Sequence, residues 1–312
     1  MVSRALLFLL LAGTLSGQYA GRGACAGCHR KQSEGHERTG HARSLAVPSA
    51  HRFAERFAGV KADWAFGAGE QAVTFVARRD DEHYVEQGLS WYAATGRMEL
   101  TPGHRHGGGE IYRTFDAEAS ILRCFQCHST GPLRLGEGYR IEPPEAGVQC
   151  ETCHGPGKAH AESGAAVRNP ARLTAVQINQ LCGECHRKPA ATGDETDWGN
   201  AWNARHQPLY LAESACFQKS GGRLSCFTCH APHAELERAA EAYGKVCGSC
   251  HAKPRHRAAT VASKGTCVGC HMPAVKPNAN LSFANHWIGV YGAGSVLRPG
   301  GRRRLVVEDG RR

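Results

Sequence analysis

The chain has 312 residues, a formal net charge of +10, 15 cysteines and 18 histidines. Fourteen of the cysteines lie in seven copies of the pentapeptide Cys-x-x-Cys-His, so that only Cys216 remains and a disulfide framework is excluded. The 38 glycines and 14 prolines argue against long regular elements and favour short helices joined by irregular chain.

The pentapeptide is the attachment signature of c-type haem. Its two thiols can form thioethers to both vinyl groups of one porphyrin, and the following histidine then lies under the iron as the proximal ligand. A zinc knuckle would combine two Cys-x-x-Cys elements in one tetrahedral site without requiring His after each of them, and a thioredoxin-like redox motif would not occur seven times. We therefore expect seven covalently bound haem c groups. The expected thioether cysteines are Cys25, Cys28, Cys124, Cys127, Cys150, Cys153, Cys182, Cys185, Cys226, Cys229, Cys247, Cys250, Cys267 and Cys270, and the expected proximal histidines are His29, His128, His154, His186, His230, His251 and His271.

The haems change the interpretation of the charge. A ferric haem with two ionised propionates contributes about −1, so seven haems lower the net charge of the protein to roughly +3. The basic residues therefore compensate propionates and do not indicate a nucleic-acid partner. We expect redox partner proteins, whose identity the sequence leaves open.

Residues 1–20 have the features of a secretory signal peptide. Arg4 precedes an apolar run from Ala5 to Leu15, which is too short to cross a bilayer and is followed by small and polar residues up to Ala20. An uncleaved membrane anchor is the alternative. Because c-type haem is attached outside the bacterial cytoplasm, we expect a periplasmic or extracellular protein with no membrane span after signal removal.

Residues 21–290 are expected to form one multihaem cytochrome domain, in which short α-helices and irregular chain surround stacked haems that replace an ordinary protein core. The first motif lies at 25–29, an insert covers 51–123, and the other six motifs lie at 124–271. Alternating Val73, Phe75 and Ala77 predict a β-hairpin or small sheet near 71–100. Thr174 is expected to cap a helix over 174–184, and the basic tail 291–312 is expected to be disordered.

Parts of the chain resemble known multihaem cytochromes. The first motif with its spacer to His41-Ala42, and the run from Cys124 through Gly138–Val148 to Gly157, resemble the tetrahaem cytochrome c of ammonia oxidisers, the partner of hydroxylamine oxidoreductase. The last three motifs, including Cys229-His230-Ala-Pro-His233, resemble the hydroxylamine-oxidoreductase and nitrite-reductase multihaem group. The resemblance implies electron transfer, and it implies that His41 is an axial ligand of a haem other than its own.

After the proximal ligands, 11 histidines remain for seven distal positions, so that every iron could be bis-His. Only Met98 and Met272 follow the signal segment, which limits His/Met ligation to one haem at most. His233 cannot easily bind the iron of His230, because both lie on one short turn, and is expected to serve a second haem. His36, His83 and His256 are expected to face solvent. The expected distal ligands are His41, His160, His206, His233 and His286, with His104 and His51 as further candidates.

A bis-His iron is saturated and has no position for a substrate, so we expect an electron carrier in which electrons hop along closely packed haems, without catalytic residues. The first alternative is an oxidoreductase of a small nitrogen or sulfur compound at a five-coordinate haem. The absence of Cys-x-x-Cys-Lys argues against it. The second alternative is a subunit of an extracellular haem filament. Cys216 is expected to be a buried small side chain; an iron ligand or an intermolecular disulfide are the alternatives.

Overall fold

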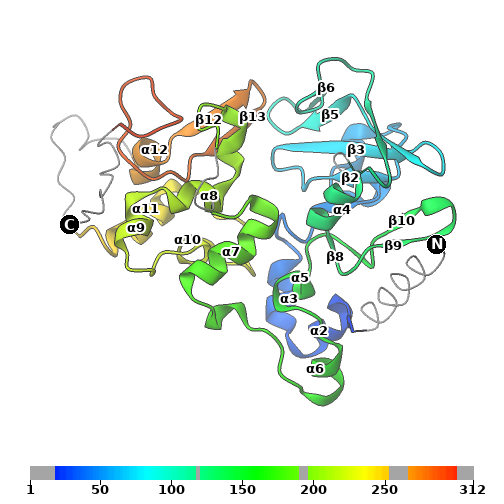
Figure 1. Ribbon diagram of the computed structural model, residues 1–312, viewed down its shortest axis with the longest axis horizontal. Coiled ribbons are helices and arrows are strands. Elements are labelled where there is room, and N and C mark those ends of the chain that lie inside the picture. Colours follow the sequence, from blue (N-terminus) through cyan, green and yellow to red (C-terminus); the bar gives the residue numbers. More distant parts are fainter. Residues whose placement is uncertain (1–17, 117–119, 190–195, 253–265, 301–312) are drawn as a thin grey trace, which may run out of the picture. The chain divides into compact units, whose positions relative to one another are not determined.

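The structure is a computed structural model that describes residues 18–116, 120–189, 196–252 and 266–300 (Figure 1). Most of the predicted signal peptide and of the predicted tail lie outside these residues, as does His256. The chain forms two compact units. Unit 1 extends to Leu173 and also contains Ala231–Leu236, whereas unit 2 contains Thr174–His230 and the chain from Glu237 onward.

The described helices of unit 1 are short, and three of them end within or directly at a haem motif. The α-helices are α2 (Arg22–Cys28), α3 (Arg30–His36), α4 (Leu122–His128), α5 (Cys150–His154) and α6 (Lys158–Ser163). The 3-10 helices are η1 (Pro48–Ala50), η2 (Ala54–Phe57), η3 (Glu137–Tyr139) and η4 (Pro170–Arg172). Helix α5 ends at His154 because Gly155 has a φ of +75°, which stops the helical hydrogen-bond ladder.

Unit 1 also contains a seven-stranded antiparallel sheet. Its strands are β1 (Leu45–Ala46), β2 (Trp64–Phe66), β3 (Ala72–Arg78), β4 (His83–Glu86), β5 (Leu89–Tyr92), β6 (Arg97–Leu100) and β7 (Glu110–Arg113). The order is β1-β2-β3-β4-β7, while β5 pairs with both β3 and β6 (Figure 1). Two further pairs, β8 (Ser129–Thr130) with β11 (Glu145–Ala146) and β9 (Arg134–Leu135) with β10 (Ile141–Glu142), follow helix α4.

The predicted hairpin is confirmed as β3–β4, but the sheet is larger than expected. Strand β4 ends at Glu86 and β5 begins at Leu89; Gly88 between them lies against the backbone of Gly107, where a Cβ would be only 2.2 Å away. Strands β1, β2 and β7 are too short to give a detectable alternation in the sequence.

The sheet of unit 1 has a hydrophobic core made of protein side chains. Phe125, which lies between the two cysteines of the second motif, is 0% exposed and packs edge-on against Trp64 and Phe66. The second motif is therefore anchored to the sheet by Phe125, a residue of the motif itself. We expected porphyrins to replace the protein core, but in this part of the chain the core is made of protein side chains.

Unit 2 consists of short helices and one hairpin. Its helices are α7 (Ala175–His186), η5 (Ala201–Arg205), α8 (Gln207–Ala212), α9 (Ala215–Lys219), α10 (Cys226–Cys229), α11 (Ala240–Gly248) and α12 (Cys267–His271), and the hairpin is β12 (Ala274–Asn278) with β13 (Leu281–Ala284). Helix α7 starts where predicted, with a capping box in which Thr174 accepts a bond from the Gln177 backbone and Gln177 bonds back. It continues to His186, so the fourth motif is its last turn.

Candidate haem-binding sites

The motifs place two sulfurs and one imidazole on the same face of a helical turn. Residues three and four positions apart lie on one side of a helix. In the first, fifth and sixth motifs the backbone N–H of the histidine donates to the backbone carbonyl of the first cysteine. The N···O distances are 2.8 Å from His29 to Cys25, 2.9 Å from His230 to Cys226 and 2.9 Å from His251 to Cys247. Each of these turns can therefore present both thiols and the imidazole to one porphyrin.

Three proximal histidines face a predicted distal histidine. The ring centroids are 6.2 Å apart for His29 and His160, 6.1 Å for His154 and His233, and 6.3 Å for His230 and His286. The interplanar angles are 20°, 15° and 38°. An iron that binds a ring nitrogen on each side at about 2 Å holds the two ring centroids roughly 6 Å apart. The spacing of all three pairs thus fits an iron between the rings.

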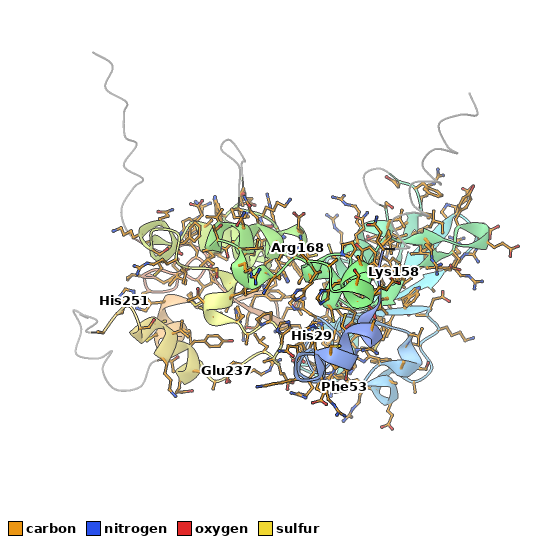
Figure 2. The ribbon with its side chains drawn as sticks, turned by 90° about the horizontal axis from the view of Figure 1, so that it is seen from below. His29, Phe53, Lys158, Arg168, Glu237 and His251 are labelled. Carbon is orange, nitrogen blue, oxygen red and sulfur yellow. The ribbon has the colours of Figure 1, made fainter. Side chains whose placement is uncertain are left out.

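The hydrogen bonds of the rings fit the same role. In each of five histidines Nδ1 donates to a backbone carbonyl, which leaves Nε2 as the nitrogen with a lone pair for a metal. The bonds run from His128 to Ser44 (3.0 Å), from His154 to Arg168 (3.0 Å), from His160 to Ala165 (2.8 Å), from His271 to Gly289 (2.8 Å) and from His286 to Ala284 (2.9 Å). Figure 2 labels Arg168, together with His29 and with Lys158 at the start of α6.

Burial favours the neutral, metal-binding form of several histidines in and near the motifs. It lowers the pKa of His128, His230 and His233 below the usual value of a histidine. For His286, burial lowers the pKa to about 4. The pKa of His206 also falls to about 4, through burial and then through the nearby charges of Arg205 and Arg187.

His206 lies close to the fourth motif. The proximal His186 is near enough to contribute to the lowered pKa of His206. The Nδ1 atom of His206 is buried and has no hydrogen-bond partner among the described residues. A buried ring nitrogen without a partner is costly unless a ligand or metal satisfies it.

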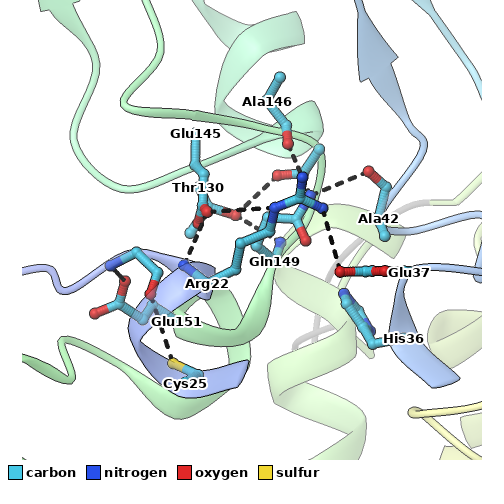
Figure 3. Close-up of polar contacts among 12 residues, drawn as sticks. Arg22, Cys25, His36, Glu37, Ala42, Thr130, Glu145, Ala146, Gln149 and Glu151 are labelled. Atoms are coloured by element: carbon cyan, nitrogen blue, oxygen red, sulfur yellow. Dashed lines mark hydrogen bonds and ion pairs between the residues drawn. The ribbon is translucent and has the colours of Figure 1, made fainter. Parts of the chain in front are cut away.

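His41 lies beside the third motif. Its carbonyl accepts bonds from the backbone N–H groups of Val148 (2.9 Å) and Ser44 (3.1 Å), just upstream of Cys150. The amide of Gln149 donates to Ala42 (3.1 Å) and Ala146 (2.8 Å), which holds this loop in place (Figure 3).

The two weaker candidates have other bonds. The side chain of His104 is 3% exposed and its Nε2 donates to Glu86 at 3.0 Å, so that only Nδ1, which is buried and has no hydrogen-bond partner in the described part of the chain, is left for an iron. In His51, Nε2 donates to Gly67 (3.0 Å) and Nδ1 accepts from the N–H of Phe53 (3.1 Å). Both nitrogens of His51 are used, which fits a structural residue and not an iron ligand.

His36 was expected to face solvent, but it does not. It is half-buried, and its Nε2 donates to the carbonyl of Val148 at 2.8 Å. His83 begins β4, its side chain is 28% exposed, and its Nδ1 bonds to Asp80 at 2.7 Å. This partly exposed position next to the turn fits the surface role expected of His83.

Cysteines from different motifs lie side by side within each unit. The thiols of Cys25 and Cys150 in unit 1 are close enough for one to affect the pKa of the other, as are those of Cys182 and Cys226 and those of Cys247 and Cys267 in unit 2. Helices α2 and α5, α7 and α10, and α11 and α12 accordingly pack in pairs. Each contact places the attachment points of two haems next to each other.

Two polar residues that support these helix pairs were not found by sequence reasoning. Asn179 is 1% exposed, and its Oδ1 accepts from the N–H (2.9 Å) and Sγ (3.2 Å) of Cys226, tying α7 to α10. Glu151, in the third motif, accepts backbone N–H bonds from Ala20 (2.9 Å), Gly21 (2.8 Å) and Gly157 (2.7 Å). Figure 3 shows Glu151 beside Cys25. Both residues follow no motif spacing, so the sequence carries no signal for them.

Cys216 lies among the attachment cysteines of unit 2. Burial raises the pKa of its thiol, and the thiol of Cys250 raises it further. Cys229 and Cys247 are also close enough for Cys216 to affect their pKa values. Cys216 is thus a partly buried residue between the fifth and sixth motifs.

The known proteins to which this chain is similar, described here and in the next paragraph, are cytochromes. The family model for "Cytochrome c554 and c-prime" matches residues 106–155, which contain the second and third motifs. The chain is 27% identical over 171 residues to the multihaem cytochrome MtrA of Shewanella baltica (strain OS185), a match that covers 48% of this chain and 45% of MtrA. The chain thus spans less than half the length of this curated relative.

Two solved structures share the fold. The outer cell wall cytochrome OcwA matches with a TM-score of 0.57 and 17% identity, covering 87% of this chain and 79% of OcwA. An undecahaem cytochrome from the S-layer of Carboxydothermus ferrireducens matches with a TM-score of 0.50 and 17% identity, covering 87% of this chain and 52% of that protein. The predicted fold class, with short helices and small antiparallel sheets, is confirmed.

The chain is a multihaem c-type cytochrome with covalently bound haem, of the kind that cytochrome c554, MtrA and OcwA represent. Along the residues that the structure describes, no helix is both long and apolar enough to cross a membrane.

Proposed function

We propose that this protein is a heptahaem cytochrome that carries electrons between redox partner proteins outside the cytoplasm. The observation that carries the proposal is the set of three histidine pairs at 6.1 to 6.3 Å. Iron held between two imidazoles has no exchangeable position, so it can pass electrons but cannot bind a substrate. Haem iron supplies the one-electron chemistry when it is bound.

The residues of the chain then have two tasks. The 14 motif cysteines hold the porphyrins, and the proximal and distal histidines close both axial positions of the irons. We assign His160 to the first haem, His233 to the third, His206 to the fourth and His286 to the fifth. His41 remains a proposed ligand without an assigned iron, and His104 is a candidate only through Nδ1.

The cross-motif cysteine contacts support transfer between neighbouring haems. In unit 1 the contact of Cys25 with Cys150 brings the first and third attachment sites together. In unit 2, α7 packs on α10, α10 on α11, and α11 on α12, so that the fourth to seventh sites follow one another. A succession of adjacent sites is what electron hopping needs.

An extracytoplasmic location is supported by the relatives, since two of them are named for the outer cell wall and for the S-layer. The signal peptide over 1–20 and the domain boundaries at 21 and 290 remain part of this proposal. Redox partners of unknown identity complete it.

Mass spectrometry and EPR of the purified ferric protein test the function. We expect the mass of seven haems and only low-spin signals. A mass of fewer haems would contradict the haem number. A high-spin signal that shifts on adding nitrite or hydroxylamine would show an open iron, and would favour the small-molecule oxidoreductase over the carrier.

A further inference from the structure

The proposed sixth ligand of the third haem is carried by a short segment that has no regular structure of its own. Residues 231–236 form neither helix nor strand, and within them one backbone bond, from Ala234 to Ala231 at 3.1 Å, is described. Yet the ring of His233 lies nearly parallel to that of His154. Something outside the segment must therefore fix its position, because an unsupported loop samples many conformations.

The closest approach to this segment comes from helix α3, at Gly35. Gly35 is buried, and a Cβ built on it would lie 2.2 Å from the carbonyl oxygen of His233. Real Cβ atoms essentially never come within 3.0 Å of another heavy atom, so any side chain at position 35 must displace the backbone of the ligand residue. The glycine therefore sets how near the segment can come to α3.

The next residue of α3, His36, contacts the same segment with its ring. Its centroid is 6.5 Å from that of His233, with the two rings edge to face at 72°, and its Nδ1 lies 3.5 Å from the carbonyl oxygen of Pro232. Its Nε2 donates to the carbonyl of Val148, two residues before the third motif. His36 thus lies between residues 231–236 and the chain that leads into Cys150.

We propose that Gly35 and His36 are positioning residues that hold His233 over the iron of the third haem. The inference rests on the proposed His154–His233 pair. Gly35 provides the space for the backbone of His233, and His36 fixes the ring of His233 from its edge while its own orientation is fixed by Val148. Because α3 directly follows His29, the segment that binds the first haem also sets the axial ligand of the third.

The substitution Gly35→Ala tests whether the backbone of His233 needs the space that Gly35 leaves. Alanine favours helices over glycine, so a purely local effect would strengthen α3 and leave the haems unchanged. We expect instead that one haem becomes high-spin by EPR while the mass still shows every haem attached. Added imidazole should return that haem to the low-spin state, because it fills the position that His233 has left. Gly23→Ala in α2 is the matched control, since a Cβ there meets nothing within 4 Å.

Substitutions of His36 test whether its ring holds the ring of His233 in place. His36→Ala should produce the same imidazole-sensitive high-spin signal in part of the molecules. His36→Gln, which keeps an amide donor for Val148, should reduce that fraction. If Gly35→Ala protein fails to mature, the His36 variants decide the matter: a fully low-spin His36→Ala protein overturns the inference.

The variant His233→Ala separates this inference from the proposed function. If His233→Ala leaves every haem low-spin, the His154–His233 ligation itself is wrong. If His233→Ala gives a high-spin haem and both Gly35→Ala and His36→Ala stay low-spin, the ligation stands and only the positioning role is overturned.

Discussion

The ring of His160 lies 6.2 Å from the ring of His29 and at 20° to it, although 131 residues separate them in the chain. His160 belongs to α6, and α6 starts four residues after the third motif. The first haem is thus predicted to take its sixth ligand from the segment that follows the third. Loss of this ligand should be visible without loss of the haem, because the thioethers and the proximal ligand remain.

We therefore expect His160→Ala protein to keep its full haem mass and to show one new high-spin ferric signal by EPR. His83→Ala is the control, because His83 bonds to Asp80 on a hairpin turn and should leave the spectrum unchanged. A fully low-spin spectrum of the His160→Ala protein would refute the assignment.

Replacing His286 by methionine should raise the reduction potential of one haem. A Met/His pair favours the reduced iron more than a bis-His pair, and axial ligands tune haem potentials over about 0.8 V. A spectroelectrochemical titration should show one component moved to higher potential and the others in place. His286→Ala should instead give a high-spin haem. Unchanged titrations of both variants would remove His286 from the ligands.

His51 should matter for stability and not for ligation. Both of its ring nitrogens are bonded to backbone groups, and its ring packs against Phe53 and Phe57. His51→Ala should lower the free energy of unfolding by roughly 1–3 kcal/mol, since it leaves buried polar groups unpaired. Denaturant unfolding followed by circular dichroism measures this. A new high-spin signal in this variant would mean that His51 binds iron after all.

Glu151→Gln should loosen the turn at Gly157, directly after the third motif. One amide oxygen replaces two carboxylate oxygens, of which Oε1 accepts the backbone N–H of Gly157, so we expect a loss of about 1–3 kcal/mol of stability. Hydrogen exchange should become faster at Gly157. Glu184→Gln, which removes an exposed ion pair to Lys188, is the control and should be close to neutral. Equal exchange in both variants would argue against the role of Glu151.

The sequence predicted the features that depend only on residues close together in the chain. Cys-x-x-Cys-His spacing defines a helical face, and Thr174 with Gln177 defines a helix start, so both were readable from the chain. The position of His233 was also predictable in part, because a residue three after His230 cannot reach the opposite face of the same haem.

Contacts between residues far apart in the chain could not be predicted from the sequence. Only the tertiary structure shows that Gly67 and Phe53 occupy both ring nitrogens of His51, while His286 bonds to the carbonyl of Ala284 through Nδ1. His36 was assigned to solvent because nothing in its sequence neighbourhood indicates Val148, which is 112 residues away. The core around Phe125 depends on strands too short to be recognised by their alternation.

The packing of helix pairs links motifs that are distant in the chain. Helix α2 packs on α5, α7 on α10 and α11 on α12, and both helices of each pair carry a haem-attachment motif. The two haems attached to one pair would share the space around a single helix contact. A substitution that separates the helices of a pair is therefore expected to disturb two haems together and not one alone.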